Sequence, residues 1–454
     1  MKLNKIVIII AMWVTMVQAA DKIPAFPGAE GFGAFTPGGR GGQVLFVNNL
    51  NDGGPGSFRA ACEAKGPRII VFRVAGIIDL LSPVIVFEPF ITIAGQTAPG
   101  DGICLRGYGL RVDTHDVIIR FLRCRAGDNL VSERDDALSI GGNSQNVIID
   151  HCSVSWGTDE TLSTSGRTSD LTVQWCIISE ALHYSIHHEG PHGMGTLGRA
   201  IGGVTFHHNL WAHNNQRNPR LGDAYNEPPA PTFDVRNNVM YNYGQYCNGL
   251  NSGEYTVNFI ANYIKPGPDS DRKNKPVVLR KDTRADYYIV DNVVEGFPEL
   301  TEDNRKMLEP QIVNEIANQN YIPARKNVAD LVTFVDSPID VPAVKTTSAL
   351  NAYHDVLTKV GATAPVRDLV DERIIKEVRS GAGSIIDSQF QVGGWPEYRY
   401  GRPERDSDRD GMPDEWEKAK GLNPLDEADT VKDRDADGYT NIEEYINSLA
   451  EPFM

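Results

Sequence analysis

The chain has 454 residues, of which 41% are hydrophobic, and its formal net charge is −16. This length suffices for one large domain with appendages and a sizeable buried core. The acidic balance argues against a nucleic-acid partner, because a phosphate backbone is bound by basic surfaces that displace its counterions. An anionic substrate stays compatible with the composition if local cations or a bound metal reverse the local field.

The first twenty residues have the layout of a secretory signal peptide. Lys2 and Lys5 precede an apolar run, and the small residues Ala19 and Ala20 follow it. A membrane anchor is the weaker alternative, because the run is short for a bilayer span. We therefore expect residues 1–20 to be removed and the mature chain to be secreted, to the extracellular space or the periplasm, as a monomer without a membrane span.

Residues 21–298 repeat one short pattern, in which β-branched or apolar residues lead to Asn or Cys and then to another apolar residue. The repeats are spaced by about 24 to 33 residues, a length typical of solenoids. Strand-rich units with Asn at the turn predict an all-β domain, a right-handed parallel β-helix. Aligning the segments places these residues in one column: Cys124, Cys152, Cys176, Asn209, Asn238, Asn262 and Asn292.

Stacking explains this column. Equivalent positions of successive turns of a β-helix lie about 4.8 Å apart. Asn at a tight turn can adopt the left-handed conformation and pass an amide hydrogen bond to the next Asn, whereas Cys is a small apolar filler. An even cysteine count in an exported protein suggests disulfides. The stacking hypothesis instead makes Cys124, Cys152 and Cys176 buried free thiols, with one disulfide between adjacent turns as the alternative.

Residues 299–400 lose the repeat and contain helix-like stretches at 347–361 and 370–381. We expect them to form a mixed helical and irregular flank that packs on the β-helix.

Two acidic loops mark a small C-terminal module, residues 401–454. Residues 406–417 and 433–444 place oxygen-bearing side chains at loop positions 1, 3, 5, 9 and 12, with Gly at position 6. This pattern suits Ca²⁺, which takes about six to eight oxygens; a solvated acidic tail is the alternative. Arg402-Pro403-Glu404 is a poor entering helix, so the module resembles EF-hand-like loops of the dockerin or thrombospondin type, with structural ions. The expected metal-binding residues are Asp406, Asp408, Asp410, Met412, Glu417, Asp433, Asp435, Asp437, Tyr439 and Glu444.

Polar groups on successive repeats form a second candidate site. Asp135 and Asp136 are adjacent at a strand start and point to opposite faces, so at most one of them joins a given site. Because the turns stack, Asp136 and Asp159 can lie a few ångströms apart and form part of an oxygen cage for calcium. An ordinary solvated carboxylate is the alternative for either one alone. The groups in question are Asp136; Asp159, Glu160 and Ser163; and Arg217 with Arg220.

From about residue 26 to 296 the chain resembles the pectate lyases, which are polysaccharide lyases of the parallel β-helix type. The resemblance implies an enzyme that cleaves polygalacturonate-type pectin by calcium-assisted β-elimination and leaves 4,5-unsaturated oligogalacturonides. The segments that carry it are DDALSI (135–140), VIIDHCSVSW (147–156), DETLS (159–163), VTFHHNLWAHNNQRNPR (204–220) and DVRNNVMYNYG (234–244).

The resemblance also implies roles for single residues. Asp136 and Asp159 match the calcium ligands, and Ser163 stands where a third aspartate is usual. Arg217 matches the arginine that takes the proton from C5 of the uronate. The family's second arginine falls on Gly222, so we expect Arg220 to replace it in substrate binding. His183 falls on a substrate-binding lysine of the family, and Asp150 and His151 match a motif that is mainly structural.

β-Elimination needs cations, because the C5 proton lies beside a carboxylate that resists further negative charge. Calcium and arginine stabilise the charge that develops there. Arginine is an unusual base because its pKa lies above about 12, and neighbouring cations and an alkaline optimum would favour its deprotonation. His183, His192 and a metal-bound hydroxide are alternative bases. Two other functions stay open: a polygalacturonase-type hydrolase, which needs convergent carboxylates, and a non-catalytic uronan-binding β-helix protein.

Overall fold

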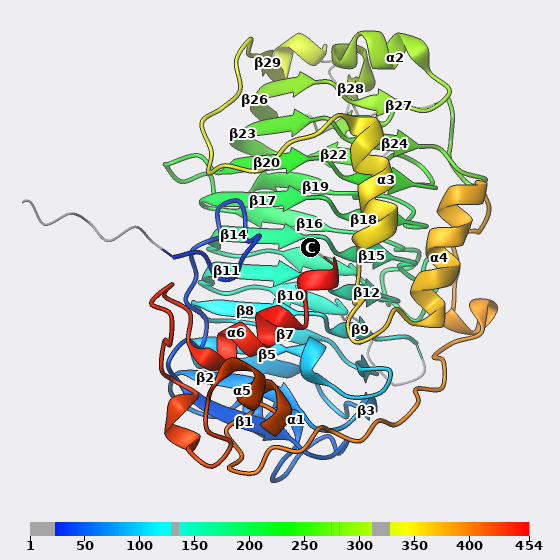
Figure 1. The fold of residues 1–454 in the computed structure, drawn as a ribbon. Helices are drawn as coiled ribbons and strands as arrows, with labels where there is room; N and C mark the ends of the chain where they lie inside the picture. Colours follow the sequence, from blue (N-terminus) through cyan, green and yellow to red (C-terminus); the bar gives the residue numbers. More distant parts are fainter. Residues whose placement is uncertain (1–22, 129–135, 274, 281, 311–326, 454) are drawn as a thin grey trace, which may run out of the picture.

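Three parallel sheets wrap around one coil in the computed structural model, which describes residues 23–128, 136–273, 275–280, 282–310 and 327–453. From β2 to β28 each turn of the coil contributes one strand to each sheet, whereas β1 and β29 add to one sheet only; successive turns stack along the coil axis (Figure 1). The predicted parallel β-helix is confirmed. Residues 1–20, the expected signal peptide, and Asp135 lie outside the described residues.

In the described part of the chain, sheet A has eleven strands and sheets B and C have nine each. Sheet A consists of β1 (Gln43–Val47), β2 (Arg68–Phe72), β5 (Ile91–Ala94), β8 (Val117–Arg120), β11 (Gln145–Asp150), β14 (Ser169–Gln174), β17 (Gly203–His207), β20 (Thr232–Arg236), β23 (Gly253–Ile260), β26 (Thr283–Val290) and β29 (Val332–Phe334). Sheet B consists of β3 (Gly76–Asp79), β6 (Ile103–Arg106), β9 (Arg123–Arg125), β12 (Ser153–Ser155), β15 (Ile177–Ser179), β18 (Leu210–Ala212), β21 (Val239–Tyr241), β24 (Tyr263–Lys265) and β27 (Val293–Val294). Sheet C consists of β4 (Val84–Val86), β7 (Leu110–Val112), β10 (Leu138–Ile140), β13 (Leu162–Thr164), β16 (Leu197–Ala200), β19 (Arg220–Asp223), β22 (Asn248–Leu250), β25 (Val277–Leu279) and β28 (Leu308–Pro310).

The first strands of sheet A, such as β2 and β5, are nearly continuous apolar runs, as expected where both faces of a parallel sheet are covered. Later strands such as β26 alternate between buried and more exposed residues. Val147 pairs with Leu171 and Ile149 with Val173, and these side chains are buried in the core that fills the coil. β-Branched residues suit this environment because they pack well on a pleated surface. Register is therefore strongly specified, since a slip by one residue would turn the core side chains outward.

The asparagine column is confirmed. The side-chain oxygen of Asn238 accepts a hydrogen bond from the backbone N–H of Asn209 at 2.9 Å. The side-chain oxygen of Asn262 likewise accepts from the backbone N–H of Asn238 at 3.0 Å. Asn292 continues the ladder, and Asn304 ends it by accepting the N–H of Asn292 at 2.8 Å. These buried amides satisfy backbone groups that the turn leaves without a partner in the sheets.

Two details of the expected column are wrong. Cys124 pairs with Val154, two residues beyond the ladder, so Leu122 and not Cys124 stacks below Cys152. The left-handed residue is also not the ladder residue but the one before it, for example His208 at φ 53° and Asn237 at φ 54°. The ladder residue keeps a right-handed or extended backbone, because its side chain must point inward to reach the next turn.

All six cysteines are buried and free, so the disulfide alternative is wrong. Burial raises the pKa of the Cys104 thiol to about 11. Such thiols act as small apolar fillers of the core.

The coil extends beyond residue 298, where we expected it to end. β28 pairs with β25 and β29 pairs with β26, so the last strands lie inside the segment assigned to the flank. The helices are α1 (Phe58–Cys62), α2 (Pro298–Glu302), α3 (Ala349–Lys359), α4 (Leu369–Ser380), α5 (Asp414–Lys420) and α6 (Asn441–Ser448). The 3-10 turns are η1 (Gly95–Thr97), η2 (Asn304–Met307), η3 (Val328–Asp330), η4 (Gln389–Val392), η5 (Glu427–Asp429) and η6 (Glu451–Phe453). None of these described helices has the length and apolarity needed to cross a bilayer.

α3 and α4 form where the sequence predicts helices, and they lie along sheet B (Figure 1). The side chain of Asp368 caps α4 by accepting the N–H of Asp371 at 3.0 Å, and Gly381 ends the helix at φ 72°. Burial of apolar side chains from α4, such as Ile374, against the coil holds the flank in place.

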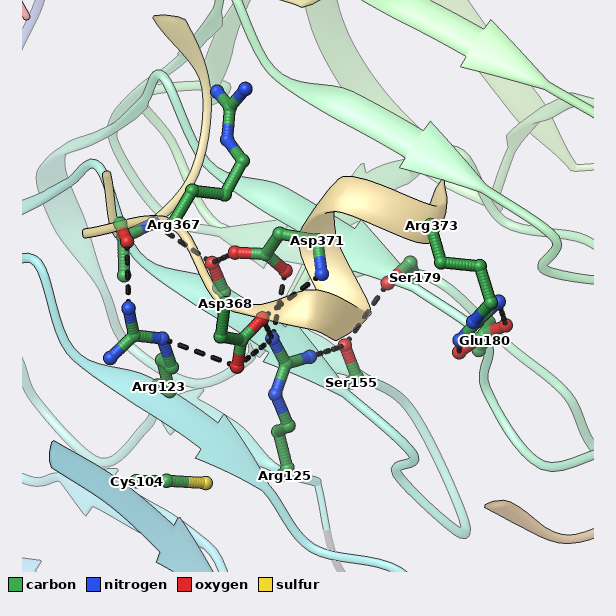
Figure 2. A network of polar contacts seen from close by, with 12 residues as sticks. Cys104, Arg123, Arg125, Ser155, Ser179, Glu180, Arg367, Asp368, Asp371 and Arg373 are labelled. Atoms are coloured by element: carbon green, nitrogen blue, oxygen red, sulfur yellow. Dashed lines mark hydrogen bonds and ion pairs between the residues drawn. The ribbon is translucent and has the colours of Figure 1, made fainter. Parts of the chain in front are cut away.

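A buried ionic network fixes the start of α4 on the coil (Figure 2). The guanidinium of Arg125, on β9, donates to Asp368 at 3.0 Å and to Asp371 at 2.8 Å. Arg123 lies 3.3 Å from Asp368, and Ser155 accepts a further hydrogen bond from Arg125 at 2.8 Å. The four charged groups thus neutralise one another out of contact with water.

The C-terminal module packs on the outer face of sheet A at the first turns of the coil (Figure 1). Met412, Ile442 and Ile446 form one apolar cluster with Ile69 and Val71. Arg73 adds an ion pair to Asp406 at 2.7 Å. The module is therefore docked on the β-helix and not a loose tail.

Candidate active site at the edge of sheet C

Three loops that lead into sheet C bring together most of the predicted site residues. Asp136 lies two residues before β10, Asp159 lies between β12 and β13, and Arg217 lies between β18 and β19. Parallel bridges join Glu160 to Met194 and Met194 to Gln216, so the loops stay in register outside the strands. The stacking of the turns therefore continues into the loops.

Asp136, Asp159 and Glu160 each offer a carboxylate oxygen, and these oxygens lie within 4.8 Å of one another. The expected proximity of Asp136 and Asp159 is confirmed. Glu160 joins these two aspartates in the carboxylate group. It lies next to Asp159 in the sequence, but the spacing of the residues gives no reason to expect both side chains at the same site. The hydroxyl of Ser163 donates a hydrogen bond to Asp136. At this position, where a third aspartate is usual in the family, Ser163 thus holds the carboxylate of Asp136.

Burial and the Asp136 charge raise the pKa of Glu160 well above its ordinary value. This side chain is only 5% exposed, and the backbone N–H of Glu160 donates to Asp136 at 3.1 Å. Three clustered carboxylates repel one another, and a divalent cation relieves that repulsion. Carboxylate oxygens are the ligand type that calcium prefers, so these residues fit the predicted ion.

Arg217 points into the same group and forms an ion pair with Glu160. Its backbone adopts the left-handed region at φ 65°, which costs a non-glycine residue about 1–2 kcal/mol. Two hydrogen bonds hold it there: Thr196 donates to the Arg217 carbonyl at 2.6 Å, and Asn218 donates to the Cys247 carbonyl at 2.8 Å. Sparsely populated backbone conformations of this kind cluster at functional sites.

Histidines from the loop between β15 and β16 surround Asp159. The Nε2 atoms of His192 and His187 lie 3.5 Å and 3.8 Å from its carboxylate. His183 lies behind them, with its Nδ1 3.1 Å from the carbonyl oxygen of His192. The predicted substrate-binding residue His183 is thus next to the site through His192.

Arg220 is placed differently from Arg217. It is only 3% exposed, and its guanidinium donates to Tyr246 at 2.9 Å and to Asn251 at 3.0 Å. Burial lowers its pKa to about 10. Its predicted contact with substrate stays a prediction. Arg199, which the sequence did not single out, pairs in register with Gly222. It therefore lies one turn away from the position where the family has its second arginine.

The two acidic loops of the module have the predicted turns. In the first loop, Asp406 accepts the N–H groups of Arg409 at 2.7 Å and Gly411 at 3.2 Å. In the second, Asp433 accepts those of Ala436 at 2.7 Å and Gly438 at 2.9 Å. Gly411 and Gly438 have φ values of 101° and 97°, which explains why glycine stands at position 6.

The first loop is the more buried of the two. Asp406, Asp408 and Asp410 present oxygens within 4.8 Å of one another, and so do the exposed Asp433, Asp435 and Asp437. At position 7, Met412 and Tyr439 are both buried. At position 12, Glu417 has both oxygens buried without a hydrogen-bond partner, whereas Glu444 accepts from Arg434 at 2.6 Å.

Comparison with known proteins places these residues in a family. A probable pectate lyase C of Aspergillus flavus is 36% identical over 441 residues, which cover 96% of each chain. A probable pectate lyase C of Aspergillus fumigatus is 36% identical over 438 residues and covers 95% of each. A search against family models found no match.

Solved structures show the same fold at low identity. A pectate lyase bound to a hexasaccharide aligns with a TM-score of 0.51 at 14% identity, covering 76% of this chain and 99% of that one. The major allergen of cedar pollen aligns with a TM-score of 0.50 at 18% identity, covering 72% and 90%. Because the 36% identity to the Aspergillus proteins extends over nearly the whole length of each chain, we conclude that the chain belongs to the pectate lyase family.

Proposed function

We propose that the protein is a pectate lyase that cleaves polygalacturonate-type pectin by β-elimination. One observation carries this proposal: Arg217 lies against the carboxylate group of Asp136, Asp159 and Glu160. The relatives of the protein are named probable pectate lyases, and a structural neighbour is a pectate lyase with a bound hexasaccharide. Both support an acidic polysaccharide as the substrate.

The roles of the residues follow from charge. Asp136, Asp159 and Glu160 would hold a calcium ion, whose charge would neutralise the uronate carboxylate and make the C5 proton more acidic. Arg217 takes that proton, and the 4-oxygen of the sugar leaves, so that a C4–C5 double bond forms. An arginine accepts a proton only in its neutral form, so this step fits an alkaline optimum.

The test is to incubate the purified protein with polygalacturonate and with methylated pectin, in calcium or in chelator. We expect ultraviolet absorbance from the unsaturated product, only with calcium. New reducing ends without absorbance would indicate a hydrolase instead, and calcium-dependent binding without any product would indicate a non-catalytic uronan-binding protein.

Replacing Glu160 with glutamine should raise the calcium concentration for half-maximal activity by about tenfold or more, because calcium affinity depends on the number of charged ligands. The variant keeps the size of the side chain and removes its charge. The measurement is a calcium titration of the elimination rate.

The matched gain-of-charge variant is Ser163→Asp, which places the family's usual carboxylate beside Asp136 and should lower the calcium requirement. Glu227→Gln, at an exposed ion pair with Arg167, should leave the titration unchanged. A Glu160→Gln enzyme with the wild-type calcium dependence would remove Glu160 from the ion's ligands.

We further propose that both acidic loops of residues 401–454 bind structural calcium. The buried, unpartnered oxygens of Asp408, Asp410 and Glu417 support this, because buried carboxylates are stable only when paired or metal-bound.

In calcium-free protein, the contribution of the C-terminal module to stability should fall as the pH rises from about 4 to about 8. Burial and neighbouring carboxylates raise the pKa of Asp410 to about 8 and that of Glu417 to about 7. In this window the folded module holds protons that the unfolded chain has released, so its stability is lost as pH increases. Calorimetric unfolding at pH 5 and pH 8, each in chelator and in calcium, measures the effect, because the rise in melting temperature on adding calcium should be larger at pH 8. A calcium-induced rise that is no larger at pH 8 than at pH 5 would contradict the buried carboxylate cluster.

We propose, finally, that residues 1–20 direct secretion and that the mature protein is a monomer. Sequencing of the exported protein should give an N-terminus directly after Ala20, and a retained N-terminus would contradict this.

A further inference from the structure

Three buried carboxylates meet in the module, and one of them lies outside the predicted loops. Asp410 and Glu417 belong to the first loop, whereas Asp429 is the last residue of η5. Each offers an oxygen within 4.8 Å of the others. Their exposed fractions are 3%, 0% and 5%.

Most oxygens of this group have no hydrogen-bond partner: Asp410 Oδ2, both oxygens of Glu417, and Asp429 Oδ1. Desolvation of one carboxylate costs several kcal/mol, and a protein offsets that cost with a counter-charge in good geometry. The ion pairs at this loop go to other carboxylates: Arg73 pairs with Asp406 and Arg405 with Asp414. The convergent oxygens therefore point to a metal ion as their partner.

We propose that Asp429 is an additional calcium ligand, which completes the site of the first loop from the linker between the two loops. This inference rests on the proposal above that the first loop binds calcium. The additional ligand makes the two calcium sites of the module unequal. The first site gathers buried carboxylates from two segments, whereas the second presents three exposed aspartates, and its Glu444 is held by Arg434. Because calcium affinity rises with the charge and rigidity of the ligand set, the first site is the tighter one.

The same residue connects the two loops. The side-chain amide of Asn441, at position 9 of the second loop, donates to the carbonyl oxygen of Asp429 at 2.7 Å. The hydroxyl of Thr430 donates to the carbonyl oxygen of Asp410 at 3.1 Å. An ion held by Asp410 and Asp429 therefore fixes the linker, and with it the helix α6 that packs on sheet A.

The experiment compares full-length wild type with Asp429→Asn, which keeps the shape and removes one charge. Thermal unfolding is followed in excess calcium and in chelator, and calcium binding to the decalcified proteins is followed by calorimetry. In calcium the variant should melt below wild type, and its tightest calcium affinity should fall at least tenfold. In chelator it should melt at or above wild type, because one repelling carboxylate is gone. Glu427→Gln, an exposed neighbour in η5, should match wild type in both conditions.

An equal loss of melting temperature in calcium and in chelator would assign Asp429 a purely structural role and overturn the proposal, as would unchanged calcium affinity. A wild type that binds no calcium tightly would overturn both the loop sites and the role of Asp429. The lyase proposal is judged separately, by the absorbance assay, so the two failures are distinguishable.

Discussion

Replacing Arg217 with lysine should lower kcat by about 10²- to 10⁴-fold, with little change in the affinity for polygalacturonate. The backbone of Arg217 is fixed in a left-handed turn, so its guanidinium reaches Glu160 from one direction. Lysine keeps the positive charge but replaces the planar guanidinium group by a compact ammonium group on a flexible side chain. The variant therefore still attracts the anionic polymer but lacks the group that accepts the proton.

Two measurements check this result. The absorbance assay gives the elimination rate, and calorimetric titration with a short oligogalacturonate gives binding. Arg167→Lys is the matched control, because Arg167 is exposed and pairs with Glu227 on the surface, and it should retain full activity. Near wild-type turnover of Arg217→Lys would reject Arg217 as the base and leave His192 as an alternative base.

Replacing Arg125 with methionine should lower the free energy of unfolding by about 3–5 kcal/mol. The side chain of Arg125 is completely buried and contacts both Asp368 and Asp371. Burial alone would raise the pKa of Asp368, but the charges of Arg125 and Arg123 lower it well below its usual range. Without Arg125, two carboxylates stay buried at the start of α4 with too little counter-charge. Urea denaturation followed by tryptophan fluorescence measures the loss.

The control for this variant is Arg399→Met. Arg399 pairs with Asp101 at 2.9 Å, but its side chain is 81% exposed, so its loss should cost less than about 1 kcal/mol. Adding Asp371→Asn to Arg125→Met should restore part of the stability, because it removes one of the unpaired charges. If Arg125→Met and Arg399→Met were equally stable, the ionic network would not hold α4 on the coil.

Local repeats made the coil predictable from the sequence. A repeated apolar stretch before Asn209, Asn238 and Asn262 specifies strand, turn and ladder together, since each turn is built from its own residues and stacks on the next. The same holds for the two acidic loops, whose candidate ligands and turn glycines lie within twelve residues. The error at Cys124 arose because residue type outweighed spacing: counting from the strand start assigns the ladder position to Leu122.

Long-range contacts explain what the sequence did not predict. The pairing of Arg125 with Asp371 joins residues 246 positions apart, and no repeat connects them. Glu160 joins Asp159 in the site because both lie in a loop, where the alternation of a strand does not apply. Arg220 is buried against Tyr246 because the loop before β22 covers it, and that covering depends on a loop conformation that spacing does not encode.

The ladder of stacked turns has a consequence for how this family changes over evolutionary time. Each turn contacts mainly the turns before and after it, so the duplication or loss of a complete turn beyond the site leaves the spacing between Asp136, Asp159 and Arg217 untouched. A deletion of one residue within a strand would instead shift a whole row of core side chains. Length differences among homologues should therefore fall in whole turns or in the loops between sheets, and seldom within a strand.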